Sequence, residues 1–193
     1  MQRLSNFLLR LWGFKLEGDP GNHLKHRIFA VIPHTSNWDF PLGLLVRSAA
    51  GIKVSYIGKS SLFKPPFGFI FRALGGYPVD RSRSHKYVDA VAALFQTHPQ
   101  FSIAIAPEGT RKKVDRLKTG FYHIARLAGV PIIMTKFDYG RMVVAFSDPF
   151  YPTGDLEKDF AVMSAFYKDA RGKNPELGFD FAQSKSDFKT KEN

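Results

Sequence analysis

The chain has 193 residues, a length typical of one domain. Hydrophobic residues make up 44% and charged residues 23%, as in ordinary globular proteins, so we expect an ordered core. The 28 Lys and Arg residues outnumber the 17 Asp and Glu residues, and the formal net charge of +11 favours nucleic acid, an anionic membrane or an acidic protein as partner. The chain has no Cys, which excludes disulfides, thiolate metal sites and a Cys nucleophile.

Residues 1–22 are predicted to form an amphipathic N-terminal segment with a helix over 4–16. Its apolar residues recur at helical spacing: Leu4, Leu8, Leu11 and Trp12. This stripe either packs on the rest of the domain or lies in the plane of a membrane, with Arg side chains at the lipid headgroups. No run approaches the roughly 18 apolar residues of a membrane-spanning helix.

The rest of the chain alternates predicted strands with predicted helices. Strands are expected at 28–33, 53–58, 77–79, 101–106, 131–137 and 142–146. Helices are expected at 39–50, 66–74, 84–97 and 119–128. This alternation predicts a single α/β domain over 23–180, with a mostly parallel mixed sheet flanked by helices. Residues 181–193 are expected to form a polar tail.

The first polar cluster is His34-Thr35-Ser36-Asn37-Trp38-Asp39, directly after the 28–33 strand. Sites in open α/β sheets form at the carboxyl ends of strands. If His34 lies in the loop and Asp39 in the first helical turn, Asp39 can accept a hydrogen bond from one imidazole nitrogen and leave the other as a general base. Ser36 or Asn37 would then cap the helix. The alternative is a structural His beside an unrelated helix-capping Asp.

The second cluster, Pro107-Glu108-Gly109-Thr110-Arg111, directly follows the 101–106 strand. It combines a carboxylate, a flexible Gly and a guanidinium that can bind a phosphate group bidentately. Five cations fall within eight residues: Arg111, Lys112, Lys113, Arg116 and Lys118. The alternative is a solvated basic loop. A third element, Gly76–Arg81, is either part of a site or a turn with a surface Asp80–Arg81 pair.

Together with the Val130–Ile133 strand, these elements resemble the lysophosphatidic acid (glycerolipid) acyltransferase family in order and spacing, over roughly residues 29–140. The resemblance implies that His34, oriented by Asp39, deprotonates an acceptor hydroxyl, which then attacks an acyl thioester. It also implies which residues hold the acceptor head group: Arg81, Glu108, Gly109, Thr110, Arg111 and Lys118. Met134 stands where the family usually has a second Pro, so the acceptor stays open between lysophosphatidic acid and a lyso-amino-lipid of the ornithine type.

The resemblance implies acyl-ACP (acyl carrier protein) or acyl-CoA as co-substrate, with no cofactor and no metal. Acyl carrier protein is acidic and acyl-CoA anionic, so charge does not separate them as donors. We expect a cytoplasmic protein, peripheral on the inner face of the cell membrane, that binds anionic lipid through its basic surface, its N-terminal helix and the Phe-rich stretch 62–72. Core packing is the alternative for that stretch. No nucleic-acid partner is expected, since no recognition helix or RNA-binding sheet signature occurs.

Overall fold

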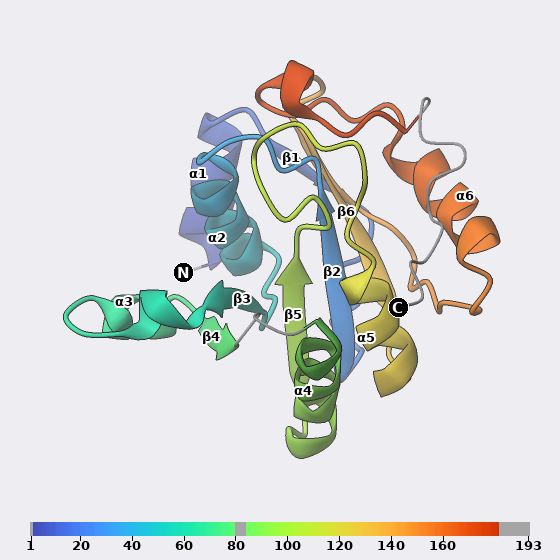
Figure 1. The fold of residues 1–193 in the computed structure, drawn as a ribbon. Helices are drawn as coiled ribbons and strands as arrows, with labels where there is room; N and C mark the ends of the chain where they lie inside the picture. Colours follow the sequence, from blue (N-terminus) through green and yellow to red (C-terminus); the bar gives the residue numbers. More distant parts are fainter. Residues whose placement is uncertain (1, 80–83, 182–193) are drawn as a thin grey trace.

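The structure, a computed structural model, describes residues 2–79 and 84–181. Its centre is a seven-stranded sheet with helices on both faces (Figure 1). The strands are β1 (Lys15–Glu17), β2 (His26–Ile32), β3 (Ser55–Lys59), β4 (Gly76–Val79), β5 (Phe101–Ile105), β6 (Ile132–Asp138) and β7 (Val143–Phe146). They lie in the order β1-β7-β6-β2-β5-β3-β4, and all neighbours are parallel except β6 and β7. The predicted mostly parallel mixed sheet is confirmed.

The helices divide between the two faces of the sheet. Those with resolved bounds are α1 (Gln2–Leu11), α2 (Asp39–Ala49), α3 (Gly68–Ala73), α4 (Ser84–Thr97), α5 (Gly120–Ala128) and α6 (Leu156–Tyr167). Side chains of α1 and α2 pack in one hydrophobic cluster, and those of α4, α5 and α6 in another. α3 lies on an arm with β3 and β4 that projects from the body (Figure 1).

The central strand β2 explains why two cores form. Its residues alternate between the two clusters: Ile28, Ala30 and Ile32 face α4 and α5, whereas Phe29 faces α2. All four side chains are at most 3% exposed. A strand that is apolar on both sides fits only between two covered faces, as in parallel α/β sheets.

The N-terminal helix is shorter than predicted and turns its apolar stripe outward. α1 ends at Leu11, and residues 15–17 form edge strand β1 instead of helix, so the prediction of a helix to residue 16 is wrong. Ser5 and Leu9 pack inward, and Ser5 Oγ donates to Ser48 Oγ of α2 at 2.7 Å. Leu4 and Leu11 are 61% and 74% exposed, whereas Trp12 of the same stripe is half-buried and packs against the core, so the stripe packs on the domain only at its carboxyl end.

Two further segments were not predicted. α6 begins after Asp155, whose side chain accepts from the Lys158 amide at 3.2 Å as a helix N-cap. After α6 the chain returns across the carboxyl ends of the strands, as the red segment of Figure 1 shows. Phe181, the first residue of the predicted tail, is buried and stacks on Tyr167. Among the helices that the structure describes, none has the length and apolar character needed to cross a bilayer.

Candidate active site

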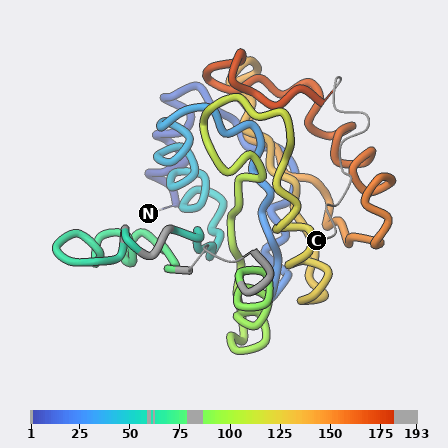
Figure 2. The backbone as a smooth tube through the Cα atoms, viewed as in Figure 1, coloured from blue at the N-terminus to red at the C-terminus, as the bar shows by residue number. Residues whose placement is uncertain are grey.

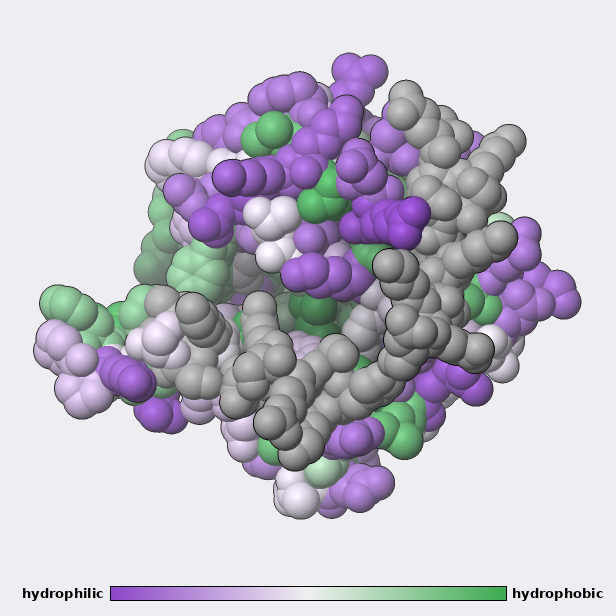
Figure 3. Space-filling view, viewed as in Figure 1, coloured by the Kyte–Doolittle hydropathy of each residue, from purple (hydrophilic) through white to green (hydrophobic). Residues whose placement is uncertain are grey.

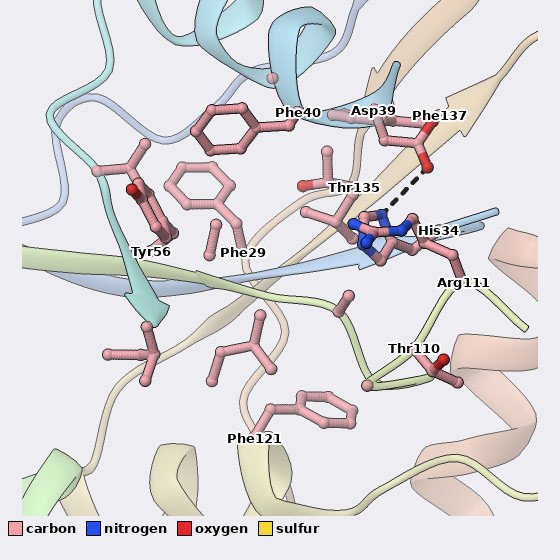
Figure 4. A pocket seen from close by; sticks show the side chains of 18 of the residues that line it. Phe29, His34, Asp39, Phe40, Tyr56, Thr110, Arg111, Phe121, Thr135 and Phe137 are labelled. Carbon is pink, nitrogen blue, oxygen red and sulfur yellow. Dashed lines mark ion pairs between the residues drawn. The ribbon is translucent and has the colours of Figure 1, made fainter. Parts of the chain in front are cut away.

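His34 and Asp39 meet where β2 ends, as Figure 4 shows. His34 lies in the loop after β2 and Asp39 is the first residue of α2, the placement that allows the two side chains to face each other. His34 Nδ1 is 3.1 Å from Asp39 Oδ2. The predicted side-chain cap is wrong: the N-cap is Trp38 without a side-chain hydrogen bond, and Ser36 Oγ instead accepts from the Trp38 amide at 3.2 Å.

Asp39 is held in a fixed orientation by two other donors. Its Oδ2 also accepts from the Ser36 amide at 2.9 Å, and its Oδ1 accepts from the Tyr139 hydroxyl at 2.9 Å. The Asp39 carboxylate is only 4% exposed. Burial is the main cause that raises the pKa of Tyr139, and the negative charge of Asp39 raises it further. The Tyr139 hydroxyl therefore stays protonated and acts as a donor. With Nδ1 of His34 directed at Asp39, its Nε2 is left for a substrate.

Glu108 lies beneath the same loop rather than in the cavity lining. It is 2% exposed, and its Oε2 accepts from the main-chain amide of His34 at 2.6 Å. Burial raises the pKa of Glu108 to about 7, opposed by the main-chain amides of His34 and Phe179. Oε1 nevertheless has no well-aligned hydrogen bond within the described residues. The structure thus gives this carboxyl group a partner in the protein, while its contact with a head group stays a prediction.

The basic loop after β5 closes on itself beside His34. The Lys118 main-chain N–H donates to Pro107 O at 2.8 Å, so residues 107–118 form a closed loop that carries the cations. Figure 2 shows this loop arching over the carboxyl end of the sheet. Gly109 adopts φ +66°, a left-handed conformation that favours Gly. A Cβ at this position would lie 2.7 Å from Lys118 Nζ, so the lysine side chain crosses the glycine.

The His34–Asp39 pair and the basic loop line one cavity of about 1580 Å³. Its lining includes the following predicted site residues: His34, Asp39, Gly109, Thr110, Arg111 and Lys118. Figure 3 shows this face hollowed at its centre, with apolar side chains at the floor and hydrophilic ones along the upper rim. Arg81 lies outside the described residues, so its role stays a prediction.

The segment after α6 completes the site, although sequence reasoning missed it. Asn174 lines the cavity and donates two hydrogen bonds to Thr35, from its side-chain Nδ2 to Thr35 O at 2.9 Å and from its main-chain N–H to Thr35 Oγ1 at 3.2 Å. Lys173 Nζ lies 4.5 Å from the centre of the Trp38 ring. These partners are far apart in the chain, so no local pattern points to them. Tyr139 was missed too, and its only signal is its position directly after a strand end.

The fold and the cavity define an α/β protein with a His–Asp pair at the carboxyl edge of a parallel sheet, beside a largely apolar cavity with a cationic rim. A model of the family described as Acyltransferase matches residues 14–136, more than half of the chain. The chain belongs to this acyltransferase family, as the order of its motifs predicted.

Individual relatives agree with this assignment. The chain is 27% identical over 182 residues to a 1-acyl-sn-glycerol-3-phosphate acyltransferase of Haemophilus influenzae, covering 84% of this chain and 75% of that protein. It is 32% identical over 136 residues to the protein of that name from Salmonella typhimurium, covering 65% of this chain and 54% of the relative. It therefore spans about three quarters of one relative and about half of the other.

A solved structure shares the fold. The crystal structure of the 1-acyl-sn-glycerophosphate (LPA) acyltransferase from Thermotoga maritima matches with a TM-score of 0.58 and 19% sequence identity. The match covers 86% of this chain and 75% of that one. At this identity the likeness shows the common α/β architecture alone.

Proposed function

We propose that this chain is an O-acyltransferase that moves a fatty acyl group from acyl-ACP or acyl-CoA to the hydroxyl of a lysolipid of the 1-acyl-glycerol-3-phosphate type. The observation that carries the proposal is the His34–Asp39 pair at 3.1 Å, inside a cavity that is apolar within and cationic at its rim. An acyl chain needs the apolar walls, and an anionic head group needs the cations. The names of the relatives favour this acceptor.

In the proposed reaction, His34 acts as general base. Its Nδ1–H donates to Asp39, so Nε2 carries the lone pair that takes the proton of the acceptor hydroxyl. The hydroxyl oxygen attacks the thioester carbonyl carbon and forms the new ester C–O bond. Collapse of the tetrahedral intermediate breaks the C–S bond, and the departing thiolate takes the proton back from His34. No covalent enzyme intermediate and no cofactor are needed.

The acceptor phosphate is assigned to the rim of the cavity. Arg111 and Lys118 both line it and both belong to the loop closed by the Lys118 amide. Arg offers two parallel donors to a phosphate and Lys a point charge. Arg81 is proposed as a further phosphate ligand on the family motif alone. A lyso-amino-lipid acceptor would not use this phosphate clamp, so the two acceptors are separable by experiment.

We also propose peripheral attachment to the inner face of an anionic membrane. The outward face of α1 exposes four apolar side chains: Leu4, Phe7, Leu8 and Leu11. The arm around α3 exposes Phe67 and Phe69 at 65% and 70%, although Phe63 of the same stretch is buried. Combined with the charge of +11, these features satisfy the need for more than one weak membrane signal.

Vesicle binding tests this attachment. We expect vesicles that contain anionic lipid to sediment the protein far better than neutral vesicles, and Leu11→Ser to weaken that binding. Leu127→Ser, which changes a comparably exposed leucine on α5 (56% exposed), serves as the matched control. Equal binding to both kinds of vesicle would refute the electrostatic part of the proposal.

Acyl transfer to a panel of acceptors tests the activity itself. Purified protein is given a labelled acyl thioester, on either carrier, together with lysophosphatidic acid, a lyso-ornithine lipid or water alone. We expect the acylated phospholipid to form fastest, and Arg111→Gln to raise the KM for lysophosphatidic acid. Faster acylation of the lyso-ornithine lipid would show that this lipid, and not lysophosphatidic acid, is the acceptor. Release of free fatty acid alone would indicate a hydrolase.

A further inference from the structure

The cavity has two apolar lobes on opposite faces of the sheet. The α2 lobe is lined by side chains of the cluster beneath α2: Phe29, Val46, Ile52, Phe137 and Phe146. The α5 lobe is lined by side chains that pack with α4 and α5: Val88, Ile105, Leu117 and Phe121. Figure 4 shows Phe29 and Phe137 on one side of β5 and Phe121 on the other.

The two lobes belong to one cavity and meet where the pairing of β3 with β5 is short. The pairing of β3 with β5 ends at Tyr56 and Ala104, although both strands continue. The residues that follow, Ile57 and Gly58 of β3 and Ile105 of β5, all line the cavity. Figure 1 shows β3 turning away from the body with its arm. The pairing of β3 with β5 therefore stops short of the carboxyl ends of both strands, and the residues beyond it line the cavity between the two faces.

The size of the cavity fits more than one apolar group. Its volume of about 1580 Å³ exceeds the roughly 300–1,000 Å³ of a pocket for a single small ligand. Transfer onto a lysolipid brings two acyl chains to one reacting centre, the chain being moved and the chain that the acceptor already has. His34 lies in the lining of the same cavity as both lobes.

We propose that the α5 lobe binds the acyl chain already attached to the acceptor, an inference that rests on the proposed function. Leu117 of this lobe directly precedes Lys118, and Ile105 leads into the loop that carries Arg111. If the phosphate of a lysolipid binds Lys118 and Arg111, the acyl chain of that lysolipid lies beside the α5 lobe. The transferred chain then occupies the α2 lobe, which is the more enclosed of the two: its five side chains named above are all buried, whereas Val88 and Ile105 of the α5 lobe are only half-buried.

One substitution in each lobe separates the two chains. Gly43 lines the cavity on α2, and a Cβ there would lie 3.8 Å from the Phe137 ring, so Gly43→Leu places its larger side chain in the α2 lobe without a backbone clash. Val88 is half-buried on α4, so Val88→Phe fills the α5 lobe. Val88→Ala enlarges the same lobe and gives a change in the opposite direction.

Calorimetry with lysophosphatidic acids of short and long acyl chain, below their micelle concentrations, measures how the affinity for the acceptor depends on the length of its chain. We expect Val88→Phe to weaken binding of the long acceptor by about tenfold or more and to spare the short one, since each methylene that loses apolar contact costs roughly fourfold in affinity. Val88→Ala should increase the difference in affinity between the long and the short acceptor, in favour of the long one. Gly43→Leu should leave acceptor binding unchanged and instead reduce transfer from palmitoyl relative to octanoyl thioester.

The outcomes are distinct. Acceptor binding that is insensitive to both Val88 variants, with melting curves showing that they fold, would overturn the assignment of the α5 lobe, as would a loss of long-acceptor binding in Gly43→Leu. A wild-type protein that binds the acceptors with this chain-length dependence but transfers no acyl group would overturn the proposed function while leaving the lobe assignment standing.

Discussion

The buried Glu108 carboxyl group should make the stability of the fold depend on pH. Its pKa in the folded protein is about 7, above the ordinary value of 4.5, because burial disfavours the charged form. The folded state therefore binds a proton that the unfolded state releases between these two values. The contribution of this group to the free energy of unfolding is fully present below pH 4.5 and is lost as the pH rises through 7.

The size of the effect follows from the same shift. A rise from 4.5 to about 7 corresponds to about 3 kcal/mol, at about 1.4 kcal/mol for each tenfold change in an equilibrium constant. Glu108→Gln keeps an oxygen that can accept from the His34 amide but cannot ionise. We therefore expect the variant to gain about 2–3 kcal/mol relative to wild type between pH 5 and pH 8.

Urea unfolding of both proteins at the two pH values measures this gain as a double difference. Other titrating groups occur in both proteins and cancel in it to first order. A stability difference that stays constant from pH 5 to pH 8 would refute the reasoning, and so would a wild type that becomes the more stable of the two at alkaline pH.

Three further changes test individual contacts. Tyr139→Phe removes the donor to Asp39, and we expect kcat to fall by about tenfold to a hundredfold, as for a hydrogen bond to a charged group, with KM unchanged; an effect on KM alone would contradict the positioning role. Tyr122→Phe removes the 2.7 Å hydrogen bond to buried Asp159, outside the cavity, and should lower the free energy of unfolding by about 1–3 kcal/mol without changing kcat. Gly109→Ala should cost about 1–2 kcal/mol of stability and raise the acceptor KM, because it strains the backbone and displaces the lysine that crosses it; an unchanged melting temperature and KM would contradict that geometry.

The sequence predicted the His34–Asp39 pair because the signals that place it are local. A buried apolar strand followed by a polar loop and a new helix puts one residue at the strand end and the other in the first helical turn. The same local logic placed α4 over residues 84–97 and located the basic loop after β5. The alternation of strands and helices was enough to predict the parallel sheet.

What the sequence did not predict depends on which surfaces meet. Helical spacing identified the stripe of α1, but the inward face is set by Ser5 and Leu9 because Ser48 of α2 offers the matching hydroxyl. The donor to Asp39 comes from Tyr139, distant in the chain, so no spacing points to it. The family resemblance implied a head-group contact for Glu108, whereas its burial beneath the His34 loop depends on the packed fold.

The central claim is that His34 is the general base of acyl transfer. The most direct measurement compares kcat/KM for transfer from acyl-CoA or acyl-ACP to lysophosphatidic acid in wild type, His34→Ala and the control His23→Ala, which changes an exposed His next to Asp19. We predict that His34→Ala lowers the rate by about 10²- to 10⁴-fold with an unchanged melting temperature, and that His23→Ala has no effect. Transfer by His34→Ala at a rate close to that of wild type would contradict the account.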